Sequence, residues 1–572
     1  MKYTGARILV ESLIQNGVDT IFGYPGGAVL NIYDELYKYK DRIRHILVSH
    51  EQHAAHAADG YARSSGKAGV CLATSGPGAT NLVTGIATAF ADSIPIVAIT
   101  GNVSIPLLGK DSFQEVDIAG ITMPIVKHSW IVEDVSDLAQ IVYEAFIVAL
   151  SGRPGPVLID IPKDISSALC EYDDSVVSKK MALSLWNDSL SEKDRAWRFF
   201  EKTKRQMFSE ADIETVAALI KNSKRPMLYA GGGVIQSGTQ TEVRKLAELL
   251  GAPVALSLMG MGAFPSEHPL CTGLIGMHGT MTSGKAVQKT DLLIAIGARF
   301  SDRVTGSIKN FAFNAKVIHI DIDPAEINKN INAALSIVGD LKQVLNRLVS
   351  KIPENFTNEW NDEINKWKAE KPKRTFNKNS FNPCFIIRET AKVLGKKAIV
   401  VTDVGQHQIW TAQFYPFENE RSFISSGGMG TMGFGMGAAA GAKIANPGTP
   451  VVLFTGDGCF RMDCAEMATL VRYGLPVLIV IFNNRTLGML RQWQNLFYES
   501  NYSQTDLDDR GPDFIKLADA YGVHGFRVTD EMSFLKALEK GMDILASGKP
   551  VLIEAIIDKD EKVFPMAIQR KV

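Results

Sequence analysis

The chain has 572 residues, of which 46% are hydrophobic and 22% are charged, a composition typical of globular proteins that excludes a largely disordered chain. Its 61 Lys and Arg residues balance 62 Asp and Glu residues, and the net charge of −1 argues against a dedicated nucleic-acid-binding protein. The length predicts about three or four domains.

The six cysteines include no C-x-x-C pair, so we predict reduced thiols of the kind found in cytoplasmic proteins and no disulfide framework. No apolar run approaches the ~18 residues of a membrane span. The N-terminal sequence passes almost at once into an amphipathic helical pattern. We therefore expect a cytoplasmic protein with no membrane segment and no signal or transit peptide.

Short apolar runs that end in glycine-rich or polar turns alternate with helical patterns, which is typical of α/β proteins with parallel sheets. The first group has predicted helices at 54–65 and 79–92, and its predicted strands with their turns are 20–26, 45–51, 69–78, 94–101 and 156–162. A second group follows at 225–234, 252–258, 291–300 and 316–324, and a third at 398–405, 449–458, 475–484 and 550–557.

Two charge-rich stretches with little strand signal, 169–211 and 351–380, are predicted linkers. They divide the chain into domains at 1–168, 212–350 and 381–572. We predict that each domain is a doubly wound parallel α/β sheet. Ligands bind such sheets beyond the carboxyl ends of the strands.

The strongest functional pattern is in the third domain. The predicted strand 451–455 runs into Gly456-Asp457-Gly458, and the predicted strand 477–482 runs into Asn483-Asn484. Because neighbouring parallel strands bring their carboxyl ends together, we expect these carboxylate and amide oxygens to meet and bind Mg²⁺. Gly458 opens a predicted helix whose N-terminal amides can hold a phosphate. The pairing favours a metal–diphosphate site over two ordinary turns.

The motifs of the chain resemble those of the thiamin-diphosphate-dependent acetolactate synthase family, in the family's order and over nearly the whole length. Besides the two motifs above, the segments that carry the resemblance are FGYPGG, SHEQ, DGYAR, TSGPGATN, SFQE, SGRPGPVLIDIPKD, RFSDRVTG, GQHQ, SGGMGTMGFG and LGMLRQWQNLFYE. The resemblance implies decarboxylation of pyruvate and ligation of the two-carbon unit to pyruvate or 2-oxobutanoate, in branched-chain amino-acid synthesis. It implies three cofactors: thiamin diphosphate, Mg²⁺ and a structural FAD.

Glu51 follows a predicted strand and begins a predicted helix, where it could simply cap that helix. The resemblance implies instead that Glu51 hydrogen-bonds the aminopyrimidine ring of a cofactor whose diphosphate is held by a second subunit. Gly27 and Gln114 are the other catalytic residues that it implies. A homodimer or homotetramer with active sites at the subunit interface follows, together with a small regulatory subunit as partner.

The remaining site residues come from the same resemblance. The implied thiamin-diphosphate contacts are Gln406, His407, Gly430, Met432, Gly458, Cys459, Gly488 and Met489, and the implied magnesium ligands are Asp457, Asn484 and Thr486. The implied FAD contacts are Arg153, Gly231, Gly232, Gly233, Leu258, Met277, His278, Gly297, Arg299, Asp321 and Asp340. The implied substrate contacts are Phe113, Arg303, Met489 and Trp493. The planar guanidinium of Arg303 suits a carboxylate.

Several positions depart from the family pattern, as does the tail VFPMAIQRKV. Ser104 stands where Pro is common beside the herbicide channel, and His53 stands where a small residue is usual. Gly437 replaces a usual Pro, Cys459 a usual Ser and Ser301 a usual Asp.

Three other patterns are weak. His50, His53 and His56 do not form the zinc motif H-E-x-x-H because residue 54 is Ala, so we expect them to face solvent or the core. Residues 428–433 match G-x-G-x-x-G, but they follow ISSG and no clear predicted strand. Residues 279–285 nearly match a nucleotide-binding P-loop, and the next residue is Ala where Ser or Thr is required.

Three alternative functions stay open at this point. A thiamin-diphosphate enzyme could release acetaldehyde, or acetate if the flavin oxidises the two-carbon unit. An NAD-dependent oxidoreductase built on the glycine-rich loops would leave the paired Asp457 and Asn484 motifs unexplained. An inactive scaffold would leave both Glu51 and the metal ligands unexplained.

Overall fold

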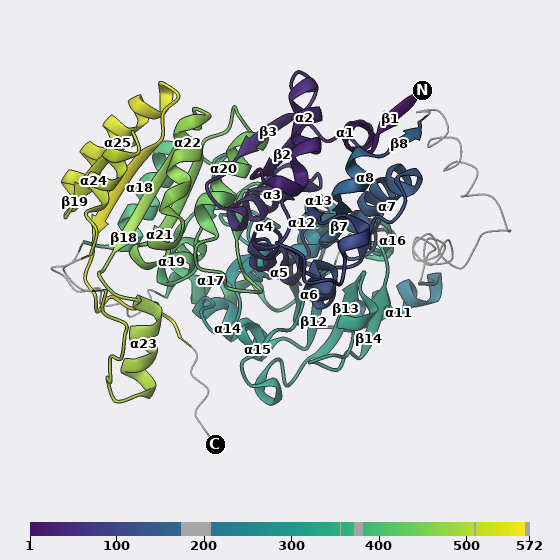
Figure 1. Ribbon diagram of the computed structural model, residues 1–572. Coiled ribbons are helices and arrows are strands. Elements are labelled where there is room, and N and C mark those ends of the chain that lie inside the picture. The colour runs from purple at the N-terminus through teal and green to yellow at the C-terminus, as the bar shows by residue number, and fades with distance from the viewer. Residues whose placement is uncertain (173–207, 355, 371–380, 508–510, 567–572) are drawn as a thin grey trace.

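The computed structural model describes residues 1–172, 208–354, 356–370, 381–507 and 511–566 (Figure 1). The predicted linkers 169–211 and 351–380 lie partly outside these ranges, so the domain limits stay a prediction. All six cysteines fall within the described residues, and none of them forms a disulfide there. Among the helices described, none is both long and apolar enough to cross a membrane.

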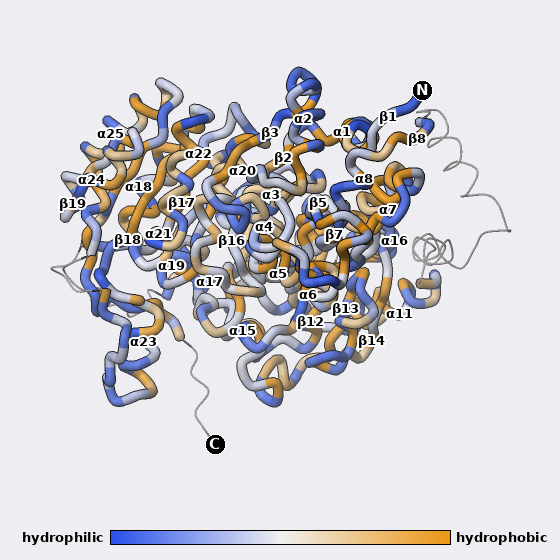
Figure 2. The backbone as a smooth tube through the Cα atoms, in the orientation of Figure 1, coloured by the Kyte–Doolittle hydropathy of each residue, from blue (hydrophilic) through white to orange (hydrophobic). Residues whose placement is uncertain are grey.

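Three six-stranded sheets form the framework of the molecule, and all strand pairs within them are parallel. The strand orders are β3-β2-β4-β5-β7-β6, β11-β10-β9-β12-β13-β14 and β16-β15-β17-β18-β20-β19. This arrangement confirms the predicted fold class. The inner strands are buried almost throughout because helices cover both faces, which explains their continuous apolar runs. Figure 2 shows the same strands as mainly hydrophobic.

The strands of the N-terminal sheet are β2 (Thr20–Gly23), β3 (Arg44–Leu47), β4 (Gly69–Ala73), β5 (Ile96–Asn102), β6 (Ser129–Ile131) and β7 (Val157–Pro162). Those of the central sheet are β9 (Pro226–Ala230), β10 (Val254–Leu256), β11 (Cys271–Leu274), β12 (Leu292–Ile296), β13 (Lys316–Asp321) and β14 (Leu335–Val338). Those of the C-terminal sheet are β15 (Ile399–Thr402), β16 (Phe423–Ser425), β17 (Val451–Gly456), β18 (Val477–Asn483), β19 (His524–Val528) and β20 (Val551–Ile556). A separate antiparallel pair joins β1 (Lys2–Thr4) to β8 (Leu169–Glu171).

The helices of the N-terminal part are α1 (Gly5–Gln15), α2 (Leu30–Lys38), α3 (Glu51–Ser65), α4 (Pro77–Asn81), α5 (Val83–Asp92), α6 (Ile118–Thr122), α7 (Leu138–Leu150) and α8 (Lys163–Ser167). The central part has α11 (Glu210–Lys221), α12 (Gly232–Ser237), α13 (Gln240–Leu250), α14 (Met281–Lys289), α15 (Asp302–Thr305), α16 (Leu341–Lys351) and α17 (Asn361–Ala369). The C-terminal part has α18 (Pro383–Leu394), α19 (Gln406–Phe414), α20 (Gly435–Ala445), α21 (Asp457–Asp463), α22 (Met467–Arg472), α23 (Gly488–Phe497), α24 (Phe514–Ala520) and α25 (Glu531–Ala546).

One expectation about the strands was wrong. The glycine-rich segment 428–433 does follow a strand, because β16 ends at Ser425 and pairs with β15. The strand has only three residues, FIS, and such a short run gives a weak periodic signal in the sequence. The segment therefore leaves the carboxyl edge of the C-terminal sheet, where ligands bind in α/β proteins.

Helices α3 and α20 pack tightly against each other and join the N-terminal and C-terminal sheets. Both helices are rich in Ala and Gly, and a Cβ at Gly60 or Gly441 would collide with the main chain of the opposite helix. One hydrophobic cluster accordingly includes Phe22 of the N-terminal part and Phe434 of the C-terminal part. Gly437 fits this contact, since an added Cβ would lie 3.0 Å from the Cβ of His56.

Candidate functional site

The carboxyl edge of the C-terminal sheet holds a buried acid. Gly456 of β17 pairs with Phe482 of β18, so the residues that follow each strand emerge side by side. Asp457 is 2% exposed, and its Oδ2 has no hydrogen-bond partner. Burial raises the pKa of Asp457 to about 7, although main-chain N–H groups of Gly458 and Arg485 act in the opposite direction. A buried carboxylate with a free oxygen is the arrangement that a cation completes.

The side chains around Asp457 come from three elements of the same edge. Asn484 follows β18, and its Nδ2 donates to Gln406 Oε1 at 3.4 Å. The Asn484 Oδ1 accepts from the Thr486 main-chain N–H at 3.2 Å, and Thr486 Oγ1 donates to the Thr505 carbonyl at 2.7 Å. Gly488 begins α23 directly against this group, since a Cβ there would lie 2.5 Å from Asn484 Nδ2.

His407, Cys459 and Met432 surround the same edge. Burial lowers the pKa of His407 to about 3, and its Nε2 is buried without a partner. The Cys459 thiol donates to the Val404 carbonyl at 3.1 Å, and burial raises the pKa of that thiol. An added Cβ at Gly458 would lie 3.6 Å from Met432 Cε. The structure therefore brings together most of the residues that the sequence assigned to thiamin diphosphate and magnesium.

Two fully buried carboxyl groups lie behind this cluster, and sequence reasoning missed both. Asp403 accepts hydrogen bonds from the main-chain N–H groups of Gly433 at 2.9 Å and Gly435 at 3.1 Å. Asp463 accepts from the Met436 N–H at 2.9 Å. Burial raises the pKa of both acids, and the charge of Asp403 raises that of Asp463 further. A sequence signal exists for Asp403, because it directly follows β15.

Glu51 lies at the carboxyl edge of the N-terminal sheet, at the start of α3. The side chain that caps α3 is that of His50, so the alternative role of Glu51 as the cap is wrong. Asn81 Nδ2 donates to Glu51 Oε2 at 2.9 Å. The other oxygen, Oε1, faces Gly78, where an added Cβ would lie 3.2 Å from it.

The other two predicted catalytic residues lie near Glu51. Gly27 begins a short 3₁₀ turn, and the next residue, Ala28, donates its N–H to Thr74 Oγ1 at 3.3 Å. Gln114 has a positive φ of 58°, and an added Cβ at Gly76 would lie 2.9 Å from its Cα. Because Thr74 and Gly76 follow β4 just before Gly78, the three predicted catalytic residues gather at one edge of the N-terminal sheet.

A cavity of about 1,210 Å³ lies between the three parts of the molecule. Of the residues assigned to FAD, those that line it are Arg153, Gly232, Gly233, Leu258, His278, Gly297, Arg299, Asp321 and Asp340. Of the residues assigned to thiamin diphosphate or substrate, those that line it are Gly430, Met489, Arg303 and Trp493. One cavity therefore connects the predicted flavin site with the predicted reaction site.

Two residues assigned to FAD, Gly231 and Met277, do not line this cavity. A Cβ added at Gly231 would lie 2.5 Å from Ala298 Cα. The close approach of these two chain segments therefore explains why a glycine is present at this position. Met277 donates its N–H to the Arg303 carbonyl at 2.8 Å. Arg303 Nη1 also lies 3.8 Å from Met277 Sδ. Met277 thus supports a cavity-lining residue.

The polar wall of the cavity is built around Arg153. Its guanidinium bonds Ser93 Oγ at 2.8 Å and forms ion pairs with Asp323 at 3.1 Å and Glu326 at 3.2 Å. Burial raises the pKa of the nearby Asp321 to about 6, helped by the charges of the same two acids. Arg153 therefore joins the N-terminal and central parts at the cavity.

The predicted substrate residues are all at least partly exposed. The Arg303 guanidinium lies 5.7 Å from the centre of the Trp493 ring, and its side chain is 64% exposed. Both residues line the cavity together with Met489. Phe113, on the N-terminal part, is 87% exposed, which is unusual for an aromatic side chain in a completed site.

The two histidines of α3 and His50, which caps it, follow the expectation of core or solvent positions. His53 and His56 are buried, and His50 is exposed. The described residues contain no group of three or more His, Cys, Asp or Glu side chains that could hold a metal ion. This finding does not bear on the predicted magnesium site, because Asn484 is an amide and is not one of these four residue types.

Three family models match successive parts of the chain. They describe the N-terminal TPP binding domain of thiamine pyrophosphate enzymes at residues 3–121, their central domain at 213–348 and their C-terminal TPP binding domain at 403–555. The fold and the two sheet-edge clusters thus define a thiamine pyrophosphate enzyme.

Similar proteins narrow this class. The acetolactate synthase large subunit of Cyanidium caldarium is 46% identical over 98% of this chain and 94% of its own length. That of Pyropia yezoensis is 45% identical over 99% and 94%, and the acetolactate synthase of Mycobacterium bovis is 46% identical over 98% and 89%. The chain belongs to the acetolactate synthase large-subunit family.

Proposed function

We propose that this chain is the catalytic subunit of an acetolactate synthase, which decarboxylates pyruvate and joins the two-carbon unit to a second pyruvate or to 2-oxobutanoate. The observation that carries the proposal is the buried, unpartnered Oδ2 of Asp457 beside Asn484. Identities of 45–46% with acetolactate synthases over nearly the whole length support the choice of reaction.

The donor set at the C-terminal edge fits Mg²⁺, which prefers carboxylate, amide and carbonyl oxygens. We assign it Asp457 Oδ2 and the Asn484 side-chain oxygen. The resemblance adds Thr486 as the residue that would supply the third protein oxygen. The free Nε2 of His407 fits a diphosphate oxygen next to the metal. Thiamin diphosphate, when bound, supplies the electron sink for decarboxylation of a 2-oxoacid.

The side chains of this protein would bind the substrate and control its protons. Asn81 orients Glu51, so that Oε1 is the atom that holds a proton toward the cofactor ring. Arg303 would bind the carboxylate of a 2-oxoacid, and Trp493 would limit the size of the second substrate. Met432 would give the cofactor an apolar contact next to Gly458.

The cavity fits FAD in size and in lining. Its volume of about 1,210 Å³ exceeds the ~300–1,000 Å³ of ordinary ligand pockets, and arginines, acids and glycines line it with apolar residues. We assign the flavin a structural role, as in the resemblance. The residues that would contact it are those of the cavity wall named above.

A second copy of the chain would complete the site. Glu51 lies on the N-terminal sheet and Asp457 on the C-terminal sheet, and the exposed Phe113 is available to cover a neighbouring subunit. We therefore propose a homodimer, or a homotetramer built from it, and a small regulatory subunit as partner. Cysteines that form no disulfide among the described residues suit a reducing compartment such as the cytoplasm.

The test combines a spectrum with product analysis. The purified chain should show flavin absorbance and form acetolactate only when thiamin diphosphate and Mg²⁺ are present. Acetaldehyde or acetate as the main product would replace the proposal by one of the other thiamin-diphosphate reactions. NADH binding without a thiamin requirement would replace it by the oxidoreductase.

A matched pair of variants tests the proton-holding role of Glu51. Glu51→Gln should reduce acetolactate formation by about 100-fold or more, in the range expected for loss of a general acid–base group. Glu466→Gln is the control, because Glu466 Oε1 accepts from the N–H groups of Ser49 and His50 and supports the same helix start. Full activity of Glu51→Gln would refute the role.

A further inference from the structure

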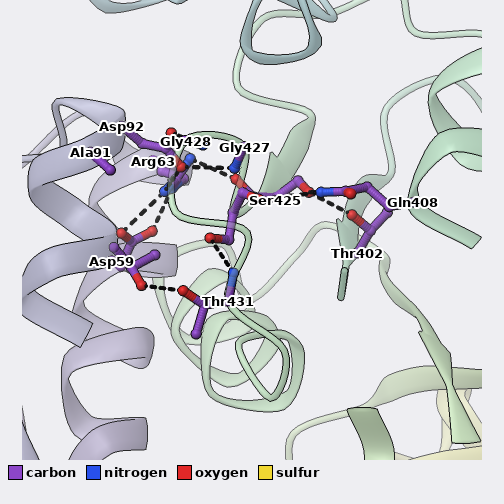
Figure 3. A network of polar contacts seen from close by, with 12 residues as sticks. Asp59, Arg63, Ala91, Asp92, Thr402, Gln408, Ser425, Gly427, Gly428 and Thr431 are labelled. Carbon is purple, nitrogen blue, oxygen red and sulfur yellow. Dashed lines mark hydrogen bonds and ion pairs between the residues drawn. The ribbon is translucent and has the colours of Figure 1, made fainter. Parts of the chain in front are cut away.

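A buried ionic triad joins α3 to the end of α5. Arg63 Nη2 donates to Asp59 Oδ2 at 3.2 Å and to Asp92 Oδ2 at 3.0 Å, and all three side chains are buried (Figure 3). Two carboxylates facing one guanidinium leave an excess negative charge away from water. Such a charge is costly unless further donors face it.

The missing donors come from the C-terminal part of the chain. The main-chain N–H groups of Gly427 and Gly428 donate to Asp92 at 3.0 Å and 2.7 Å, one to each oxygen (Figure 3). Arg63 Nη1 donates to the Ser425 carbonyl at 2.9 Å, at the end of β16. The triad thus holds the segment 425–428 from both sides.

A second contact from α5 reaches the other end of this segment. Thr88 lies four residues before Asp92 and therefore on the same face of the helix. Its hydroxyl lies 2.6 Å from that of Thr431, and both residues are buried. The Thr431 N–H donates to Ser426 Oγ at 3.0 Å, which closes the turn.

The segment 425–431 includes Gly430 and leads into Met432, two residues assigned to thiamin diphosphate. Gly430 has a positive φ of 67° and lines the cavity, and Met432 follows two residues later. Beyond Met432, Asp403 holds the N–H groups of Gly433 and Gly435. The chain from 427 to 435 is therefore fixed by carboxylates at both ends, and one of the two belongs to the N-terminal part.

We infer that Asp92 is a positioning residue for thiamin diphosphate: from the wall of the cavity assigned to FAD, it sets the conformation of Gly427–Thr431 through hydrogen bonds to the main chain, with the help of Thr88. This inference rests on the proposed function and deepens it. Arg299 extends the same contact to the cavity wall, because its Nη2 donates to the Ala91 carbonyl at 2.8 Å.

The test is Asp92→Asn, which keeps the shape of the side chain. The amide removes the charge that faces Arg63 and turns an N–H donor toward one of the glycine N–H groups. We expect the thiamin diphosphate concentration for half-maximal acetolactate formation to rise about tenfold, the effect of losing one charge-assisted hydrogen bond. The rate at saturating cofactor should change far less, and the flavin absorbance should be retained.

Asp160→Asn is the matched control. Asp160 is also a buried acid of the N-terminal part, and it accepts short bonds from Thr100 and Asn102 within the same sheet, at 2.6 Å each. We expect it to lower the melting temperature without raising the thiamin diphosphate requirement. Equal rises in the two variants, or no rise in Asp92→Asn, would overturn the inference.

Two further measurements keep the inference open to refutation. If Asp92→Asn does not fold, Thr88→Val is used instead, because it removes only the hydroxyl contact. The inference then requires that the half-saturating thiamin diphosphate concentration rise at least about twofold, and a smaller rise overturns it. Calorimetric titration with thiamin diphosphate and Mg²⁺, without pyruvate, separates the two proposals. A wild-type chain that binds the cofactor but forms no acetolactate refutes the function, and the cofactor Kd of the variants then decides the positioning role.

Discussion

His53 is a buried histidine in the contact between α3 and α20, and its titration should make this contact sensitive to acid. The side chain is 4% exposed, and burial lowers its pKa from 6.5 to about 4, helped by the charge of His50 and opposed by the Met462 carbonyl. His56 lies on its other side, with ring centres 5.9 Å apart. Between these two pKa values the His53 side chain is protonated in the unfolded chain and neutral in the folded chain. The free energy of unfolding is therefore unaffected by His53 above pH 6.5 and decreases as the pH falls toward 4.

The size of the effect follows from the two pKa values. A difference between 6.5 and about 4 corresponds to about 3 kcal/mol over the full range, at about 1.4 kcal/mol for each pKa unit. Between pH 7 and pH 5, where the chain is more easily handled, the lost part is about 2 kcal/mol. Neutral glutamine at this position can still donate to the Met462 carbonyl.

We predict that the free energy of unfolding of His53→Gln, relative to that of the wild type, rises by about 2 kcal/mol when the pH is lowered from 7 to 5. Urea unfolding of both chains at each pH measures this difference. Comparing the two chains cancels the other titrating groups that they share. His524→Gln is the control because His524 is exposed on β19. If the wild type and His53→Gln lose stability in parallel across this range, the reasoning about His53 is wrong.

Three further changes test the packing and the site. Gly60→Ala should destabilise the protein by about 2 kcal/mol or more because its Cβ would meet the main chain of Ala438. Gly284→Ala, in open space on α14, should stabilise it by up to about 1 kcal/mol. Thermal unfolding of the two variants measures both effects. Arg303→Lys should raise the KM for pyruvate about tenfold with little change in kcat, and steady-state kinetics showing a loss in kcat alone would contradict this. Asp457→Asn should raise the half-saturating Mg²⁺ concentration about 100-fold, and a metal titration of the chelated enzyme that shows no rise would place the metal elsewhere.

Local patterns explain why much of the fold could be predicted. The inner strands are continuous apolar runs such as 477–482, and each ends in a polar or glycine-rich turn, so both their existence and their carboxyl ends are visible in the sequence. The short strands β1, β6, β8, β11, β14 and β16 were not predicted because three or four residues carry no clear period, and β19, with five residues, was missed as well. Pairing Asp457 with Asn484 required only that neighbouring parallel strands end at one edge.

The class of fold, the family and the sheet edge at which Asp457 and Asn484 follow adjacent strands could be inferred from the sequence, because those features depend on local runs and on short motifs. The tertiary structure alone decided which groups lie behind that edge. Asp92 accepts a hydrogen bond from Gly427, more than 300 positions away in the chain. The Glu51 carboxylate accepts a hydrogen bond from the Asn81 side chain and does not cap α3. Such contacts depend on how α3, α5 and α20 pack, and no local pattern encodes that packing.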